Sequence, residues 1–243
     1  MKISVSILAI PRNEISIPPD INTKLILVID VLRATSSIVS ALANGAKAVA
    51  PVATIEEAYD LKKQLSHEND VILAGEKDGL IIPGFDLGNS PQKFTSNLVA
   101  NKIVILKTTN GTPLIKKFTQ AKILLTLSFL NLPAVLHYTQ AVLQKSNISE
   151  VLILEAGDEG SISPPDHLCA TLFFSCFKRR IENCTIDEKI IQNTLLTSYH
   201  GLDLISKGLS EDILFSSRIG VYQVVPVFNP RTGFFVSAEK LIP

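Results

Sequence analysis

The sequence predicts an α/β fold, with helices on both faces of a largely parallel sheet. Short runs rich in Val and Ile alternate along the chain with amphipathic segments, and several of these runs are apolar throughout. Strands of a parallel sheet are buried on both faces, so they lack the alternating polar pattern of half-exposed strands. A chain of 243 residues with 46% hydrophobic content can bury the large core that such a sheet needs.

Eight segments have the composition of buried strands. The first carries one lysine and an apolar stretch too short to span a bilayer, so we interpret it as a strand and not as a signal peptide. In chain order the predicted strands are residues 2–9, 24–30, 48–52, 70–75, 102–108, 122–126, 150–156 and 221–228.

Four helix starts are indicated by residues suited to the first turn. A Ser or Thr hydroxyl accepts a hydrogen bond from a free main-chain N–H, and Pro fits the first helical position because no N–H is needed there. The predicted caps are Thr54 with Glu57, Ser90 before Pro91, Thr112 before Pro113, and Ser163 with Asp166 as the acid of a capping box.

The chain divides best near residues 120–130. We expect residues 1–120 to form a first α/β half with anion-binding loops, and residues 121–243 to form a second half that completes the same compact unit.

Charge and cysteine content limit the class of protein. Lys and Arg number 23, as do Asp and Glu, and no block of like charge stands out, so neither a nucleic-acid nor a membrane partner is expected. Cys169 and Cys176 lie seven residues apart, on one face of a predicted helix, as small apolar residues. We therefore expect a reduced, cytoplasmic protein.

Polar, glycine-containing segments follow the predicted strands with regularity. In an open α/β sheet the ligand crevice lies outside the carboxyl ends of the strands, so segments far apart in sequence can converge there. These segments are residues 30–37, 75–79, 84–91, 107–113 and 155–166.

The segment DVLRATSS has the composition of an anion site. Asp30 ends a strand, and Arg33, Thr35 and Ser36 lie where a helix begins, with free N–H donors and a positive dipole end. The arginine fork matches phosphate, carboxylate or sulfonate oxygens. The alternative is an Asp–Arg ion pair that ties a loop, with the hydroxyls acting as ordinary caps.

Two further segments have the same construction. Thr109, Asn110 and Thr112 surround Gly111, whose missing side chain lets main-chain amides approach an oxyanion, while Asn89 and Ser90 stand at another helix start. Each of these segments, taken alone, is also compatible with a simple capped turn.

Carboxylates near these segments suggest a hard divalent cation. Glu76, Asp78 and Asp86 lie beside the proposed anion sites, and Mg²⁺ takes one or two carboxylates while sharing phosphate oxygens. Solvated loop acids are the competing interpretation.

The sequence contains no P-loop, dinucleotide fingerprint, nucleophile elbow or zinc-protease motif. His200, in the polar break SYHG, is either a site residue or a structural histidine.

Taken together, the chain resembles the 2-phosphosulfolactate phosphatase family, the ComB proteins of coenzyme M biosynthesis. The resemblance rests on VIDVLRATSSI, AGEKDGLIIPGFDLGNSP, KTTNGTP, EAGDEGSISPPD and the segment from SYHG to VVP. It implies a three-layer α/β/α fold of two structurally related halves. It also implies Mg²⁺-dependent hydrolysis of a phosphate monoester on a small sulfonated hydroxy acid.

The resemblance also implies site residues. Asp30, Glu76 and Asp86 are expected to bind metal or activate water, and Arg33 with the amides of the TTNG segment to bind the phosphoryl group. The family motif residues carried over are Asp30, Arg33, Glu76, Asp86, Asn89, Thr109, Asn110 and Gly111. The full set expected to contact substrate is Thr35, Ser36, Asn89, Ser90, Thr109, Asn110, Gly111 and Thr112.

One departure from the family pattern leaves an alternative function open. Pro165 stands where the family has a glutamate, and Glu155 replaces a cysteine. A family member that lost its chemistry at Pro165 would be a small-anion binding protein. For Asp166, the interpretation favoured is that it caps its own helix. The partner expected in either case is a small anionic phosphorylated molecule, and the sequence leaves room for a homo-oligomer.

Overall fold

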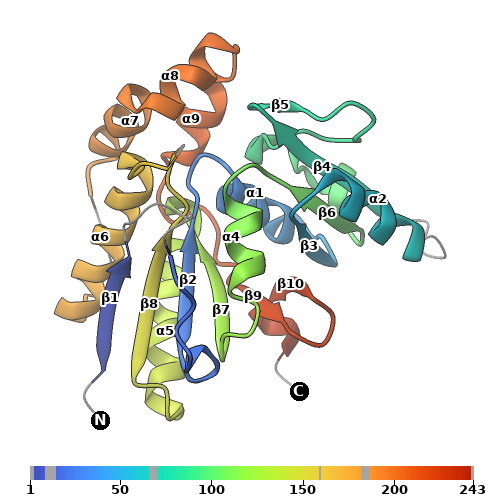
Figure 1. The fold of residues 1–243 in the computed structure, drawn as a ribbon. Helices are drawn as coiled ribbons and strands as arrows, with labels where there is room; N and C mark the ends of the chain where they lie inside the picture. The colour runs from blue at the N-terminus through green and yellow to red at the C-terminus, as the bar shows by residue number, and fades with distance from the viewer. Residues whose placement is uncertain (1–2, 9–14, 66–69, 159, 182–185, 242–243) are drawn as a thin grey trace.

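Figure 1 shows the computed structural model, which describes residues 3–8, 15–65, 70–158, 160–181 and 186–241. In this part of the chain ten strands form one mixed sheet, in the order β1-β8-β2-β7-β9-β10-β3-β6-β4-β5. Helices cover both faces, so the predicted α/β/α fold is confirmed (Figure 1). The strands are β1 (Ser4–Leu8), β2 (Leu25–Ile29), β3 (Ala48–Val52), β4 (Val71–Lys77), β5 (Leu80–Ile81), β6 (Ile103–Lys107), β7 (Ile123–Leu127), β8 (Glu150–Glu155), β9 (Pro226–Asn229) and β10 (Phe234–Ser237).

All eight predicted strands are present, with ends that differ by a few residues from the prediction. The sequence analysis missed β5 and β10, which are short and pair antiparallel with β4 and β9. The helices are α1 (Ala34–Ala43), α2 (Ile55–Gln64), α3 (Ser96–Val99), α4 (Gly111–Lys117), α5 (Leu132–Lys145), α6 (Pro164–Arg179), α7 (Glu188–Thr197), α8 (Tyr199–Ser206) and α9 (Ser210–Ser216).

The sheet contains two parallel groups, β1-β8-β2-β7 and β3-β6-β4. The hairpin of β9 and β10 lies between them and joins each group through a single residue pair, Leu125 with Val227 and Val49 with Phe235. β2 lies between β7 and β8, so the ranges 1–120 and 121–243 share one sheet and do not form separate sheets.

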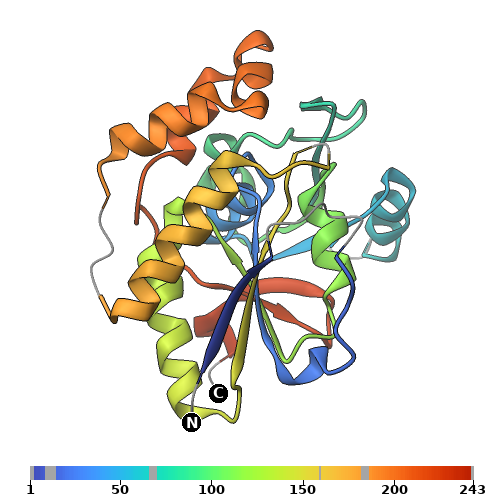
Figure 2. The same ribbon diagram turned by 60° about the vertical axis from the view of Figure 1, so that its left-hand side comes forward.

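Strand β2 shows why the parallel strands are apolar throughout. Its residues Leu25, Leu27 and Ile29 pack in a cluster with α5, α6 and α7, which Figure 2 shows on one side of the sheet. Ile26 and Val28 face the other way, into a cluster that contains α1, α4 and residues of both parallel groups. Both faces are therefore buried, and α1 and α4 form the layer between the two groups (Figure 1).

Of the four predicted helix starts, Thr54 and Ser163 directly precede α2 and α6, but of these two only Thr54 caps its helix through the side chain. Thr54 accepts a hydrogen bond from the Glu57 N–H at 3.1 Å, as predicted. Ser90 precedes only a short 3₁₀ turn, and neither Ser90 nor Ser163 caps its helix through the side chain. α4 begins at Gly111, so Thr112 lies inside the helix and does not precede it. The Ser90 hydroxyl donates instead to Asp212, and Thr112 bonds to Thr108 in the preceding loop.

The cysteines of α6 are buried, as predicted. Cys169 is a free thiol whose pKa is raised well above its usual value by burial. Cys176 is disulfide-bonded, so the expected reduced state is not met at that residue.

No helix in the described ranges combines the length and apolar character needed to cross a bilayer. A cytoplasmic location and a homo-oligomer stay predictions.

Helix α8 is fixed to α7 by a close main-chain approach. Ser198 caps α8 by accepting from the Gly201 N–H at 3.0 Å, and its hydroxyl donates to the Leu195 carbonyl at 2.8 Å. A Cβ atom on Gly201 would lie 1.8 Å from the carbonyl oxygen of Leu195. Only glycine allows the two helices to meet this closely.

We predict that Gly201→Ala lowers the free energy of unfolding by about 2–3 kcal/mol, although alanine is the better helix former, because the added methyl group overlaps a main-chain oxygen. Leu202→Ala, at an exposed position of the same helix, is the matched control and is expected to stay within about 0.5 kcal/mol. Urea denaturation measures both. Equal stability of the two variants would show that α7 and α8 are not held by this contact.

Candidate active site

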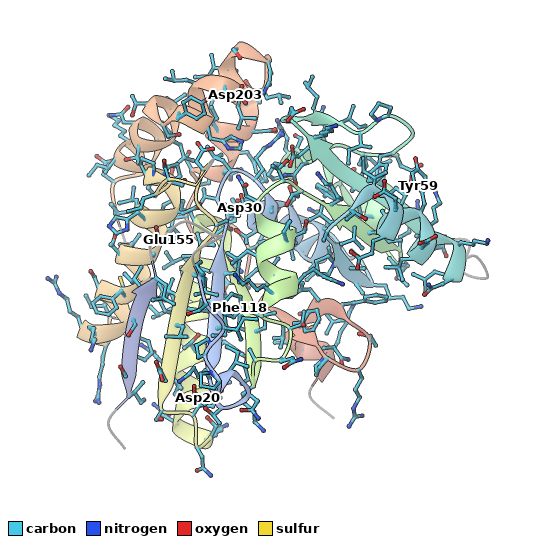
Figure 3. The ribbon with its side chains drawn as sticks, viewed as in Figure 1. Asp20, Asp30, Tyr59, Phe118, Glu155 and Asp203 are labelled. Atoms are coloured by element: carbon cyan, nitrogen blue, oxygen red, sulfur yellow. The ribbon has the colours of Figure 1, made fainter. Side chains whose placement is uncertain are left out.

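A cavity of about 150 Å³ lies at the carboxyl ends of the parallel strands. Residues that follow or end β2, β4, β6 and β8 line it, which confirms that these loops converge. Residues of α8 line it as well, and Figure 3 shows Asp203 of α8 above Asp30, which lies near the centre of the molecule. The lining residues are Asp30, Leu32, Arg33, Glu76, Asp78, Gly79, Asn89, Thr108, Thr109, Asn110, Asp158, Tyr199, His200, Asp203 and Lys207.

Asp30 is buried and held by the first turn of α1. Its Oδ1 accepts a hydrogen bond from the Ala34 N–H at 3.1 Å, and its carbonyl accepts from the Thr35 N–H at 3.0 Å. Gly111, the first residue of α4, packs against the same carboxylate, and a Cβ there would lie 2.6 Å from Oδ2. The helix start that the sequence suggested for an external anion is thus used by the protein's own Asp30.

The pKa of Asp30 is raised to about 6, mainly by burial and to a smaller extent by the nearby Glu76 carboxylate. The charge of His200, the Ala34 N–H and the Arg33 guanidinium act in the opposite direction. Two buried carboxylates that raise each other's energy in one small cavity form a site that a cation would stabilise.

Glu76 joins the β4–β5 hairpin to the loop after β6. Its Oε1 accepts from the Thr109 N–H at 2.5 Å and its Oε2 from the Gly79 N–H at 2.9 Å. Asp78 and Gly79 both have positive φ, 53° and 77°, and form the two-residue turn between Lys77 and Leu80. Asp-Gly is the preferred sequence for such a hairpin turn, so GEKDG carried a signal for β5 that the sequence analysis missed.

Arg33 forms a buried ion pair, but not with Asp30. Its Nη1 donates to Asp212 Oδ2 of α9 at 2.6 Å, and its Nη2 donates to the Gly79 carbonyl at 2.7 Å. Its Nε has no hydrogen-bond partner among the described residues. Arg33 lines the cavity while both terminal nitrogens hold protein segments together. The ion pair that the sequence suggested as one interpretation of DVLRATSS is therefore present, but its acid is Asp212 and not Asp30.

Four of the predicted substrate contacts serve the fold instead. Thr35 and Ser36 donate to the carbonyls of Asp30 and Val31, and Thr112 exchanges hydrogen bonds with Thr108. The Ser90 hydroxyl donates to Asp212. None of these four residues lines the cavity, and neither does Gly111. The hydroxyls were recognised correctly as polar groups near a helix start, but each finds an internal partner.

Asn89, Thr109 and Asn110 do line the cavity. The Asn89 side chain is buried, and its Oδ1 has no hydrogen-bond partner in the described part of the chain. Asn110 Nδ2 donates to the Gly157 carbonyl at 3.4 Å, which connects the loop after β6 to the loop after β8.

Asp86 lies away from this cavity. Its Oδ2 accepts from the Leu73 N–H in β4 at 2.8 Å and lies 3.6 Å from Lys62 Nζ, and its side chain is half exposed. The expectation that Asp86 joins Asp30 and Glu76 at one metal site does not agree with this position. In the described residues no three His, Cys, Asp or Glu side chains form a metal-binding group.

Asp166 does not cap its own helix, contrary to the interpretation favoured from the sequence. Its carboxylate accepts from the Val31 N–H at 2.8 Å and from the Gly157 N–H at 3.3 Å, so it ties α6 to the loops after β2 and β8. Burial raises the pKa of Asp166 well above its usual value, and Asp30 and Glu155 raise it further.

Pro165 and Glu155 mark the departure from the family pattern. Pro165 is buried in the first turn of α6 and does not line the cavity. Glu155 is buried at the end of β8, beside α6 in Figure 3, and its Oε1 lies 3.0 Å from His167 Nδ1. Burial raises the pKa of Glu155, while the His167 contact opposes this shift.

Helix α8 supplies the cavity residues that sequence reasoning did not assign. His200, Asp203 and Lys207 are spaced so that they share one face of the helix. Lys207 Nζ lies 2.5 Å from Asp203 Oδ2, and His200 Nδ1 lies 3.7 Å from Asp158 Oδ1. Only the SYHG segment gave a signal, because it combines a histidine with a break between helices.

We predict that Asp30→Asn stabilises the metal-free protein above pH 6. The folded-state pKa of Asp30, about 6, exceeds the unfolded value near 3.8, so the folded state binds more protons between these values. Wild-type stability therefore falls as pH rises through this window, whereas the variant lacks this loss, which is on the order of 3 kcal/mol.

Denaturation of both proteins from pH 4 to 8, with a chelator present, measures this difference. The gap between variant and wild type is expected to grow up to about pH 6 and then stay constant. A gap that does not depend on pH would contradict the raised pKa of Asp30.

Known proteins were compared with this chain. The family model described as 2-phosphosulpholactate phosphatase matches residues 14–231. A probable 2-phosphosulfolactate phosphatase of Pseudothermotoga lettingae is 39% identical over 211 residues, which cover 83% of this chain and 88% of that protein. A protein with the same description from Thermotoga maritima is 36% identical, across 88% of this chain and 92% of its own length. Another, from Carboxydothermus hydrogenoformans, is 34% identical, across 88% of this chain and 90% of its own length. The chain therefore belongs to the 2-phosphosulfolactate phosphatase family, as the resemblance of its loop motifs predicted.

Proposed function

We propose that this protein is a phosphoric monoester hydrolase that releases phosphate from 2-phosphosulfolactate, or from a closely related small phosphorylated hydroxy acid, with Mg²⁺ as cofactor. The names of its relatives support the substrate. The observation that carries the proposal is the pair of buried carboxylates, Asp30 and Glu76, that share a small cavity with Arg33.

The charge of the cavity supports the need for a cation. A substrate with phosphate, sulfonate and carboxylate groups would be repelled by a cavity in which carboxylates outnumber cationic side chains. The carboxylates are Asp30, Glu76, Asp78, Asp158 and Asp203, against Arg33, Lys207 and, when it is protonated, His200. A divalent ion would reverse the sign of the field at the buried end of the cavity.

Asp30 and Glu76 fit a Mg²⁺ ion. Mg²⁺ usually takes one or two carboxylates and completes its octahedron with water and substrate phosphate oxygens, so a third acidic ligand is not required. Asp86, tied to β4 outside the cavity, is left out of this assignment. When bound, the ion would neutralise charge on the phosphoryl oxygens.

The remaining cavity residues bind and orient the substrate. Arg33 places a positive charge at the cavity, in an orientation fixed by Asp212 and the Gly79 carbonyl, and Asn89 lines the same cavity. Thr109 and Asn110 lie on the loop whose main chain Glu76 already holds, so this wall of the cavity is rigid before substrate arrives. Such preorganisation lowers the cost of stabilising the transition state.

Asp30 is the residue we assign to the attacking group. It directly follows strand β2, is held by the α1 N-terminus, and lines the cavity. Its carboxylate either takes the proton of an attacking water or attacks phosphorus itself. Trapping with labelled substrate distinguishes these routes, because only the second leaves phosphate on Asp30.

We propose that the reaction takes place in the cytoplasm and serves coenzyme M biosynthesis, without a membrane or nucleic-acid partner. The balanced charge of the chain supports the last point, because nothing in it favours a polyanion.

We predict phosphate release from 2-phosphosulfolactate in the presence of Mg²⁺, with a loss of at least about 10²-fold when a chelator is added, because the buried carboxylates then repel the substrate. A panel of phosphorylated hydroxy acids, assayed for free phosphate, defines the substrate class. If nothing is hydrolysed while the same ligands raise the melting temperature, the chain is an anion-binding member of the family and the proposal fails.

We predict that Glu76→Gln weakens Mg²⁺ binding by at least about tenfold, because the variant loses a charged ligand but keeps a side chain of the same shape. The measurement is the Mg²⁺ concentration needed for half-maximal activity and for half-maximal thermal stabilisation. Glu211→Gln, at an exposed position of α9, is the control and is expected to match the wild type. Unchanged Mg²⁺ affinity in Glu76→Gln would remove Glu76 from the metal site without affecting the phosphatase assignment.

A further inference from the structure

His200 lies in the cavity, yet the binding and attack steps described above give it no role. It is the second residue of α8, and 24% of its side chain is exposed. The Ser198 cap and the close approach of Gly201 to the Leu195 carbonyl fix the first turn of α8 relative to α7. The main chain of His200 is therefore held in place beside the cavity, which is a requirement for a reacting group.

One side of the His200 ring faces an acid. Nδ1 lies 3.7 Å from Oδ1 of Asp158, which follows β8 and also lines the cavity. Burial lowers the pKa of His200, but Asp158 and Asp30 more than offset this effect, so that the pKa is raised overall. The charge of Asp158 thus favours a proton on the ring from the Nδ1 side, which leaves Nε2 for a substrate.

The chemistry of the proposed reaction requires a proton donor. The leaving group is a secondary alcohol, and its alkoxide is a poor leaving group unless the bridging oxygen is protonated as the phosphorus–oxygen bond breaks. Asp30 is assigned to the attacking side, so the donor must be another residue.

The other cavity residues are poor donors. Arginine does not give up its proton in proteins, Lys207 is held by Asp203 at 2.5 Å, and Tyr199 is mostly exposed. Among the described residues that line the cavity, His200 is the one suited to donate a proton near neutral pH.

We propose that His200 is the general acid that protonates the leaving alcohol, with Asp158 as its positioning residue. As the bond between phosphorus and the bridging oxygen breaks, its electron pair moves to that oxygen, which takes the proton from Nε2. Attack by water forms the new phosphorus–oxygen bond, and the proton of the water goes to Asp30. Asp30 then releases its proton to solvent, and solvent returns a proton to His200. This inference rests on the proposed function.

A substrate pair tests the role of His200. The second substrate is 2-phosphosulfolactate with sulfur in place of the bridging oxygen, because a thiolate leaves without protonation and the analogue keeps the other anionic groups. His200→Asn is expected to slow turnover of the oxygen substrate by about 10²- to 10³-fold and of the sulfur analogue by less than about threefold. His200→Gln serves as a second variant if His200→Asn has a lowered melting temperature.

The controls separate the two proposals. His137→Asn, at an exposed position of α5, is expected to change neither rate, and Asp158→Asn is expected to slow the oxygen substrate selectively but less than His200→Asn does. If the wild type hydrolyses neither substrate, the proposed function itself fails. If it hydrolyses both and the His200 variants slow both equally, or slow neither, His200 is not the general acid.

Discussion

The buried ion pair between Arg33 and Asp212 holds together the segments that enclose the cavity. Their side chains lie 179 residues apart in sequence, are almost fully buried, and meet at 2.6 Å. Arg33 also binds the carbonyl of Gly79 in the β4–β5 hairpin, while Asp212 accepts from Ser90 and Gln92. A buried pair of this kind is not a large net source of stability, but the loss of one partner leaves an uncompensated charge. Loss of either partner would therefore disturb all of the segments that this ion pair joins.

The carboxylates near the ends of β2 and β8 are buried in a less favourable way than the Arg33–Asp212 pair. Asp30, Asp166 and Glu155 are buried near one another, and burial raises the pKa of each. Residues kept in such an environment lower the stability of the resting protein, and clusters of this kind are typical of functional sites. The Arg33–Asp212 ion pair fixes the segments around the cavity. It thereby helps to keep the buried carboxylates in positions where their charged forms are unfavourable.

The sequence was sufficient for features that depend on local composition and was insufficient for those that depend on distant partners. Apolar runs predicted β2 and the other buried strands, and the rule that strand ends converge placed Asp30, Glu76 and Thr109 at one cavity. It did not reveal that Thr35 and Ser36 bond inward, or that Asp86 is tied to Leu73, because each outcome depends on which partner packs nearby. The residues of α8 were missed because a surface helix, and not a strand end, brings them to the cavity.

The strand order also constrains the way the chain can be synthesised and folded. β1 and β2 find their neighbours only in β7 and β8, which emerge from the ribosome more than ninety residues after β2 (Ile29 to Leu127 and Glu155). Until then these strands have unpaired edges and exposed apolar faces, whereas β3, β4 and β6 can already pair with each other. Non-local pairing of this kind folds slowly and exposes the nascent chain to aggregation. The pairing of the amino-terminal strands is therefore completed only after β7 and β8 have been synthesised.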